Sequence, residues 1–243
     1  MINLVLGAQF CYQSHFVNKL TRPLGQNWHM NDNLHKLSEY FTKFPGIGPR
    51  QAKRFVYFLL SRDRQFIEGL TTAILDAKKD TTQCSLCYRF FSQTIRHSVS
   101  NSLGEETVCD MCESPNTNKE LLMVVEKDVD LENIRKMGVF DGRFFVLGGS
   151  VPILDKKPVE KIRAKELFTR VQNGAKDGLK EVVLALSVNP EGENTIQYLA
   201  KILEPLAEKY SLQISTLGRG LSTGTELEYS DSDTLENALK NRG

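Results

Sequence analysis

The chain has 243 residues, of which 40% are apolar and 25% are charged, and its formal net charge is +1. This composition excludes a disordered chain, and the small net charge excludes a strongly basic nucleic-acid binder judged on the whole sequence. No apolar run approaches the roughly 18 residues of a membrane-spanning helix, and no basic residue precedes the apolar N-terminal segment as in a secretory signal. We therefore expect a folded cytoplasmic protein without membrane association.

The charge is unevenly distributed along the chain. Residues 31–83 carry nine basic and six acidic side chains, whereas residues 120–243 carry seventeen basic and twenty acidic. A nucleic-acid-binding surface is therefore to be sought in the first third. Residues 1–30 lack a clear periodicity, and we expect them to be a non-native or flexible extension; a genuine N-terminal arm is the alternative.

Residues 31–83 have the pattern of a helix-hairpin-helix. Apolar residues recur at helical spacing on both sides of a tight turn, which predicts two helices between residues 33 and 60. The turn is Phe-Pro-Gly-Ile-Gly-Pro-Arg over residues 44–50, and Pro49 suits the first position of the second helix. A further amphipathic helix is predicted over 64–78.

The turn and the second helix have features of a phosphate-binding surface. Gly46 and Gly48 supply the flexible backbone of the turn, and the N-terminus of the following helix favours an anion. Arg50, Lys53 and Arg54 fall together on the polar face of that helix. We expect these five residues to bind DNA through its phosphates, without regard to base sequence. The alternative is an ordinary helical hairpin with a solvated basic face.

Four of the five cysteines form two CxxC pairs, Cys84 with Cys87 and Cys109 with Cys112. Thiols that remain reduced at such spacing are typical metal ligands. Four thiolates complete a tetrahedral zinc site and leave no position for water, so the zinc would be structural. We expect residues 84–119 to form a four-cysteine zinc-finger module whose folding depends on the metal. A redox-active cysteine pair is the alternative.

Residues 120–215 alternate apolar strand segments with amphipathic helices, which is typical of a mainly parallel sheet covered by helices. The expected strands are 121–125, 144–147, 182–186 and 212–217, and the expected helices are 129–137, 159–171 and 195–210. Ligands of such sheets bind at the carboxyl ends of the strands. Residues 216–243 are expected to form a C-terminal loop and helix.

Acidic residues follow two of these strands. Glu126 comes after the first strand, and Glu191 and Glu193 come after the third. Carboxylates at adjacent strand ends can hold Mg²⁺, and a metal held in this way can assist phosphodiester chemistry. Acidic residues are equally favoured in the first turns of helices, so helix capping is the alternative.

The order helix-hairpin-helix, four-cysteine module, Toprim-like α/β domain resembles the RecR family of bacterial recombination mediator proteins. The resemblance covers about residues 31–242. It is carried by FPGIGPRQAKR (44–54), the two CxxC pairs, VVE (124–126), VLGG (146–149), EGENT (191–195) and GLSTGTELEYSD (220–231).

The resemblance implies a homo-oligomeric ring or clamp that encircles DNA and is not a catalyst. Such proteins work with RecO and RecF to load recombinase onto gapped or single-stranded DNA. The resemblance places Arg50 and Arg54 on the DNA-facing surface, and zinc at the four cysteines. It assigns Glu126, Glu191 and Glu193 to the Toprim acidic site, which in the family is linked more to partner binding than to cleavage. We therefore expect no catalytic residue.

Two further interpretations remain. The first is a Mg²⁺-dependent Toprim nuclease or strand-passage enzyme. Against it, the acidic pair is Glu-x-Glu where catalytic Toprim enzymes usually carry Asp-x-Asp, and no Walker A motif for ATP is present. Asn189-Pro190 also lies closer to this pair than in the family pattern. The second is a zinc-stabilised protein-interaction scaffold that does not contact DNA.

Overall fold

The computed structural model describes residues 32–92, 107–153 and 161–218, and positions 220, 221, 224, 228, 230 and 232–240. Packing divides the chain into two units, residues 1–73 and 74–243. The extension expected over residues 1–30 lies outside the described residues. The domain boundaries expected near residues 83 and 119 do not coincide with this division and stay predictions.

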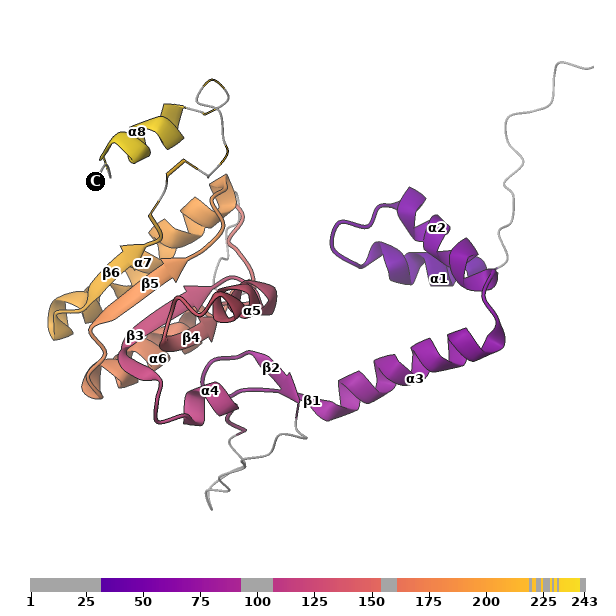
Figure 1. Cartoon of the computed structure of the whole chain (residues 1–243), viewed down its shortest axis with the longest axis horizontal. Coiled ribbons are helices and arrows are strands. Elements are labelled where there is room, and N and C mark those ends of the chain that lie inside the picture. The colour runs from indigo at the N-terminus through magenta and orange to yellow at the C-terminus, as the bar shows by residue number, and fades with distance from the viewer. Residues whose placement is uncertain are drawn as a thin grey trace, which may run out of the picture. The chain divides into compact units, whose positions relative to one another are not determined.

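The first unit contains a helical hairpin. It is formed by α1 (Asp32–Thr42) and α2 (Pro49–Leu60), and α3 (Arg64–Asp80) follows (Figure 1). The rings of Phe41 and Phe55 meet edge to face across the hairpin, with centroids 5.6 Å apart. All three predicted helices are therefore present.

The second unit is built on a four-stranded parallel sheet. Its strands are β3 (Asn118–Val125), β4 (Gly142–Val146), β5 (Glu181–Ala185) and β6 (Gln213–Thr216). Their order across the sheet is β4-β3-β5-β6, and each neighbouring pair is parallel, which confirms the predicted sheet. Val125 pairs with both Val146 and Ala185, so three strands end level with one another.

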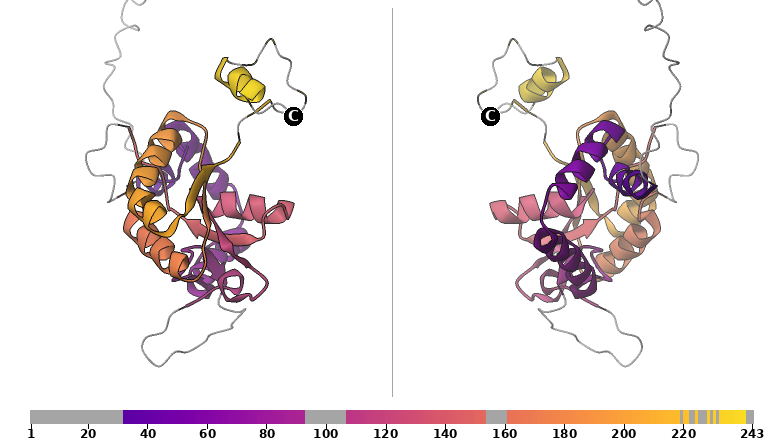
Figure 2. Two further views of the ribbon diagram at one scale, coloured as in Figure 1. Left: turned by 90° about the vertical axis from the view of Figure 1, so that its left-hand side faces the viewer. Right: turned by 90° about the vertical axis from the view of Figure 1, so that its right-hand side faces the viewer.

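Helices cover both faces of the sheet (Figure 2). Helices α6 (Ala164–Lys176) and α7 (Pro190–Tyr210) lie on one face, where strand side chains such as Phe145 pack against them. Helix α5 (Asp128–Met137) covers the other face. Helices α5 and α7, which follow the adjacent strands β3 and β5, lie on opposite faces of the sheet. The carboxyl ends of these two strands therefore form a topological switch point, the position where ligands of open α/β sheets typically bind.

The structure corrects two predicted helices. The helix expected over 195–210 begins five residues earlier, at Pro190, because the side chain of Asn189 accepts a hydrogen bond of 2.7 Å from the Gly192 amide and caps it. The helix expected over 159–171 is Ala164–Lys176, and the first two positions of that expectation lie outside the described residues. The predicted strand ends differ by up to three residues from those observed.

The sequence shows no periodicity that predicts three short elements of the structure. Strands β1 (Thr81–Gln83) and β2 (Phe90–Ser92) pair antiparallel, and α4 (Asp110–Glu113) is a single turn. A further helix, α8 (Ser232–Lys240), lies within residues 216–243, where a C-terminal loop and helix are expected. None of the described helices is both long and apolar enough to cross a membrane.

Candidate metal centre, basic hairpin and acidic edge

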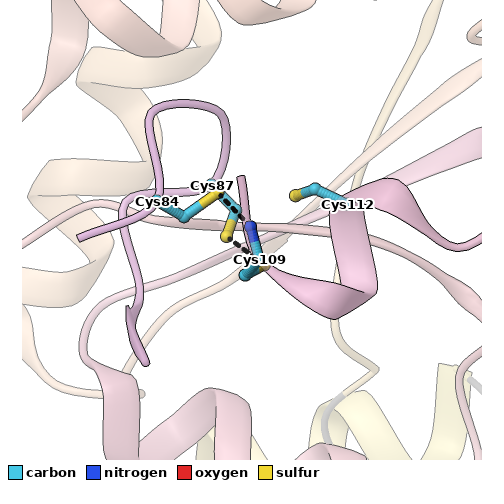
Figure 3. A group of neighbouring side chains, drawn as sticks. All are labelled: Cys84, Cys87, Cys109 and Cys112. Carbon is cyan, nitrogen blue, oxygen red and sulfur yellow. Dashed lines mark hydrogen bonds between the residues drawn. The ribbon is translucent and has the colours of Figure 1, made fainter. Parts of the chain in front are cut away.

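The four cysteines of the CxxC pairs come together in the second unit. Cys84 and Cys87 lie in the turn between β1 and β2, Cys109 caps α4, and Cys112 lies within α4 (Figure 3). Their four Sγ atoms all lie within 4.8 Å of one another, and Cys84, Cys87 and Cys109 are fully buried. The cluster can hold a metal ion, as the spacing predicts.

The backbone around Cys84 and Cys87 forms a tight turn, the cysteine knuckle, where backbone amides donate hydrogen bonds to sulfur. The amides of Leu86 and Cys109 both donate hydrogen bonds of 3.4 Å to the Cys84 Sγ. Tyr88 adopts a left-handed backbone conformation with φ +61°, which is uncommon for a residue other than glycine. Amides that point at a sulfur atom favour its thiolate form, which is the form that binds metals.

The thiols also act on one another. Hydrogen bonding, chiefly with Cys109, lowers the pKa of Cys84, and hydrogen bonding with Cys112 lowers the pKa of Cys109 to about 6. Hydrogen bonding with Cys109 raises the pKa of both Cys87 and Cys112. Cys84 and Cys109 are thus the thiols that lose their protons more readily, and a bound metal ion would replace the protons that remain on the cluster. Four converging soft sulfur ligands fit tetrahedral zinc, which would cross-link the knuckle to α4.

An arginine that the sequence analysis did not single out lies beside the cluster. Arg89 has a side chain only 12% exposed and forms an ion pair with Asp110, whose other carboxylate oxygen lies 3.1 Å from the guanidinium of Arg135. Burial opposes the charge of Arg89, but hydrogen bonding to Cys109 and attraction to nearby negative groups outweigh it and raise the pKa. A positive charge is thereby kept next to the sulfur ligands.

The cysteine knuckle is docked on the edge strand β4. The Val146 amide donates a hydrogen bond of 2.8 Å to the Cys87 carbonyl, and the Tyr88 ring lies 5.3 Å from that of Phe145. The guanidinium of Arg163 lies over the Tyr88 ring and donates to the Val146 carbonyl at 2.9 Å. The metal site and the sheet therefore share one packed structure.

The hairpin turn of the first unit presents its glycines as the sequence analysis expects. Gly46 has φ +74°, a conformation that favours glycine, and Gly48 is the extended N-cap residue of α2. Gly48 has no side chain to cap the helix and Pro49 has no N–H, so the amides of Arg50 and Gln51 are the first-turn donors that the helix itself leaves unbonded.

The basic residues of α2 are exposed on one helix face. Arg50, Lys53 and Arg54 all have exposed side chains, and Arg54 also donates a 3.4 Å hydrogen bond to Gln51. At 100° per residue, Tyr57 projects from the same face, and it is 59% exposed. The sequence analysis missed Tyr57, although its spacing of three and seven residues from Arg54 and Arg50 is a usable signal. Binding of DNA by this face stays a prediction.

Glu126 follows β3 directly, and each of its two carboxylate oxygens has a partner. Its side chain is only 8% exposed. Ser187, just after β5, donates a hydrogen bond of 2.9 Å to Oε2, and the Lys127 Nζ lies 2.9 Å from Oε1. The sequence analysis identified Glu126 and missed both partners.

Glu191 and Glu193 lie in the first turn of α7, on either side of Gly192. Glu191 is exposed and accepts a hydrogen bond of 3.4 Å from Ser150, while Glu193 is half-buried. A Cβ atom on Gly192 would lie 1.9 Å from the Ser187 carbonyl oxygen. The glycine between the two acids is therefore required by the close approach of α7 to the end of β5.

The same helical turn is tied to the loop after β4. The buried Thr195 hydroxyl donates to the Glu191 carbonyl at 2.7 Å and accepts from the Val151 amide at 2.8 Å. The Asn194 amide group donates to the Val151 carbonyl at 3.1 Å. The EGENT sequence is thus hydrogen-bonded to Ser150 and Val151, the two residues that directly follow VLGG, and the two segments form one edge.

This edge does not gather its three acids around one point. Among the described residues, the four cysteines are the group whose ligand atoms converge within 4.8 Å, and Glu126, Glu191 and Glu193 form no such group. Helix capping, the alternative to a metal site, is present at the neighbouring α5, where Asp130 accepts a hydrogen bond of 3.0 Å from the Lys127 amide.

Comparison with known proteins gives matches to three family profiles. Residues 34–78 match the one described as "RecR, helix-hairpin-helix", residues 120–217 match "Toprim domain", and residues 220–242 match "RecR, C-terminal".

Curated relatives match over most of their length. Proteins named Recombination protein RecR from Lactobacillus acidophilus and Chloroherpeton thalassium are 33% and 34% identical to this chain over 206 and 207 residues. Each match covers 85% of this chain and 94% of the relative. A protein of the same name from Rippkaea orientalis is 32% identical over 209 residues, which cover 86% of this chain and 95% of the relative.

Proposed function

Because the chain belongs to the RecR family of recombination proteins, we propose that it is a non-catalytic DNA clamp. Its role is in recombinational repair. There it helps to load recombinase onto gapped or single-stranded DNA, together with RecO- and RecF-type partners. The observation that carries the proposal is the exposed basic face at the start of α2.

The basic face suits contact with phosphates. Arg50, Lys53 and Arg54 are exposed near the start of α2, close to the two first-turn amides that the helix leaves unbonded, so positive charge and hydrogen-bond donors lie at the same end of the helix. The exposed ring of Tyr57 on this face adds a surface on which an unpaired base can stack. Such contacts do not read base sequence, which is what a clamp that acts at any gap requires.

Self-assembly is supported by the apolar surface of α3. None of the described residues of this helix is buried, yet Phe66, Leu70 and Ile74 recur every four residues along it and are 39–59% exposed. A repeated apolar stripe on a helix surface is typical of a packing interface. A ring or clamp of several copies would combine weak phosphate contacts into a useful affinity.

The metal centre would be structural, because four thiolates around zinc leave no site for a reactant. The acidic edge, with Glu191 exposed and Glu193 half-buried, suits a partner with basic side chains better than chemistry on DNA. We therefore assign the edge to partner binding and the protein to the cytoplasm, where its DNA substrate lies.

The test compares Arg50→Ala/Arg54→Ala with Lys78→Ala/Lys79→Ala, which removes the same charge from the last turn of α3. End-labelled gapped DNA is run on native and denaturing gels with and without Mg²⁺. The hairpin variant should bind DNA roughly 10–100-fold more weakly than the parent. The slope of its log affinity against log salt concentration should be smaller by about two, while the control variant binds as the parent does.

Either of two results would contradict the clamp. Equal DNA affinity of the hairpin variant and the parent would remove α2 from the DNA surface. Shortened DNA strands that appear only with Mg²⁺ and vanish in Glu126→Ala would instead establish the Toprim enzyme.

A further inference from the structure

The Toprim fold implies a Mg²⁺ site at Glu126, and the residues present do not fit one. Mg²⁺ requires oxygen ligands in near-octahedral array and is reluctant to give up its water. Here both carboxylate oxygens of Glu126 already have partners at 2.9 Å, the Ser187 hydroxyl and the Lys127 ammonium group. The carboxylates of Glu191 and Glu193 do not converge with it.

Lys127 is placed where its ammonium group can neutralise this carboxylate. It is the N-cap residue of α5, in extended conformation, and its amide is held by Asp130 at 3.0 Å. The side chain is 65% exposed, so its ammonium group keeps most of its water while it reaches the largely buried Glu126. A buried carboxylate requires a counter-charge or hydrogen bonds, and Glu126 has both from its own chain.

We propose that Lys127 occupies the place at Glu126 that a Mg²⁺ ion would take, so that the acidic edge of this protein keeps its structure without a divalent cation. A second cation at the same carboxylate would be repelled by the ammonium group at hydrogen-bond distance. A lysine is charged at neutral pH, and hydrogen bonding to Glu126 raises the pKa of Lys127 further. Metal independence of the edge follows from these contacts and is separate from DNA binding by α2.

The test is calorimetric titration of the full-length protein with Mg²⁺, accompanied by thermal unfolding with and without the ion. The parent should show neither saturable binding nor a shift in melting temperature at millimolar Mg²⁺. Lys127→Met removes the charge while keeping the length of the side chain. It should acquire saturable Mg²⁺ binding at millimolar concentration, because the freed Glu126 carboxylate can hold the ion together with water molecules. Its melting temperature should then rise with Mg²⁺.

Three further variants identify the cause. Lys127→Arg keeps the positive charge and should behave as the parent, and Lys136→Met, in the last turn of α5, should do so too. Glu126→Gln in the Lys127→Met background should abolish the acquired binding. Saturable Mg²⁺ binding by the parent, or a folded Lys127→Met protein without it, would overturn the proposal. Neither result depends on whether the protein binds DNA.

Discussion

The cysteine cluster and the acidic edge both consist of residues that bind metals elsewhere, and the chain treats them in opposite ways. Four sulfur atoms of the cluster converge within 4.8 Å, and they are largely shielded from water. The three acids of the edge lie apart, and Glu126 is neutralised by Lys127 and bonded by Ser187. Four thiolates, the form in which the cluster would bind a metal ion, would carry more negative charge than the neighbouring arginine can balance, whereas the charge of Glu126 is balanced by Lys127.

The comparison teaches that residue type alone does not make a metal site. A site needs ligands that point at a common centre and a charge that the protein leaves for the ion to balance. The cluster meets both conditions, since Arg89 supplies only one positive charge beside it. The edge meets neither in the parent protein, because its three acids form no converging group and Lys127 already balances the charge of Glu126.

The largest expected effect is loss of the metal centre. Cys109→Ser removes a buried cysteine of the cluster at the start of α4, so the protein should lose the metal ion, which we propose is zinc, as measured by elemental mass spectrometry. The free energy of unfolding should fall by about 4 kcal/mol or more, because metal binding is part of the folding energy.

Cys11→Ser is the matched control, since the fifth cysteine belongs to neither CxxC pair. It should retain zinc and stability. A Cys109→Ser protein that keeps one zinc ion per chain would mean that the metal is held by other residues.

A change at the acidic edge should act through packing and not through metal. Gly192→Ala brings a methyl group to 1.9 Å from the Ser187 carbonyl, so α7 must move away from the end of β5. We expect the free energy of unfolding, measured by chemical denaturation, to fall by about 3 kcal/mol. Mg²⁺ should not restore it.

Gly69→Ala is the matched control for this substitution. Gly69 lies within α3, and a Cβ atom there meets nothing within 4 Å. Alanine should leave stability unchanged or raise it by about 0.5–1 kcal/mol. Equal destabilisation by the two substitutions would show that the close approach at Ser187 is not what requires a glycine.

The two regions also differ in how far the sequence predicts them. Two ligands on one knuckle must be close in sequence, so both CxxC pairs, and with them all four ligands, are visible in the sequence itself. The parallel sheet is predicted equally well, since a strand buried on both faces leaves an apolar run such as Leu121–Val125. Its pairing order depends on contacts between distant segments and comes only from the structure.

The acidic edge is harder to predict, because the charge balance and hydrogen bonding of Glu126 depend on which side chains the fold brings into contact with it. Glu126 and Lys127 are neighbours, and side chains of neighbours point apart along a strand. Their contact arises because β3 ends at Val125 and the chain turns into α5. Ser187 meets Glu126 from 61 residues away, across two strand ends that nothing local brings together.

The smallest predicted effect tests the charge beside the metal. Arg89→Gln keeps a hydrogen-bonding side chain near Cys109 but removes the positive charge that partly balances the thiolates. Zinc affinity, measured by competition with a chromogenic chelator, should fall about tenfold. This is the usual effect of changing a residue that contacts a metal ligand without binding the metal itself. Arg135→Gln is the control, because Arg135 contacts the outer oxygen of the same Asp110 at 3.1 Å and should matter less. Equal zinc affinities of the parent and Arg89→Gln would mean that the convergence of the four sulfur ligands alone determines how tightly the cluster binds metal. Charge balance would then account only for the lack of a metal site at the acidic edge.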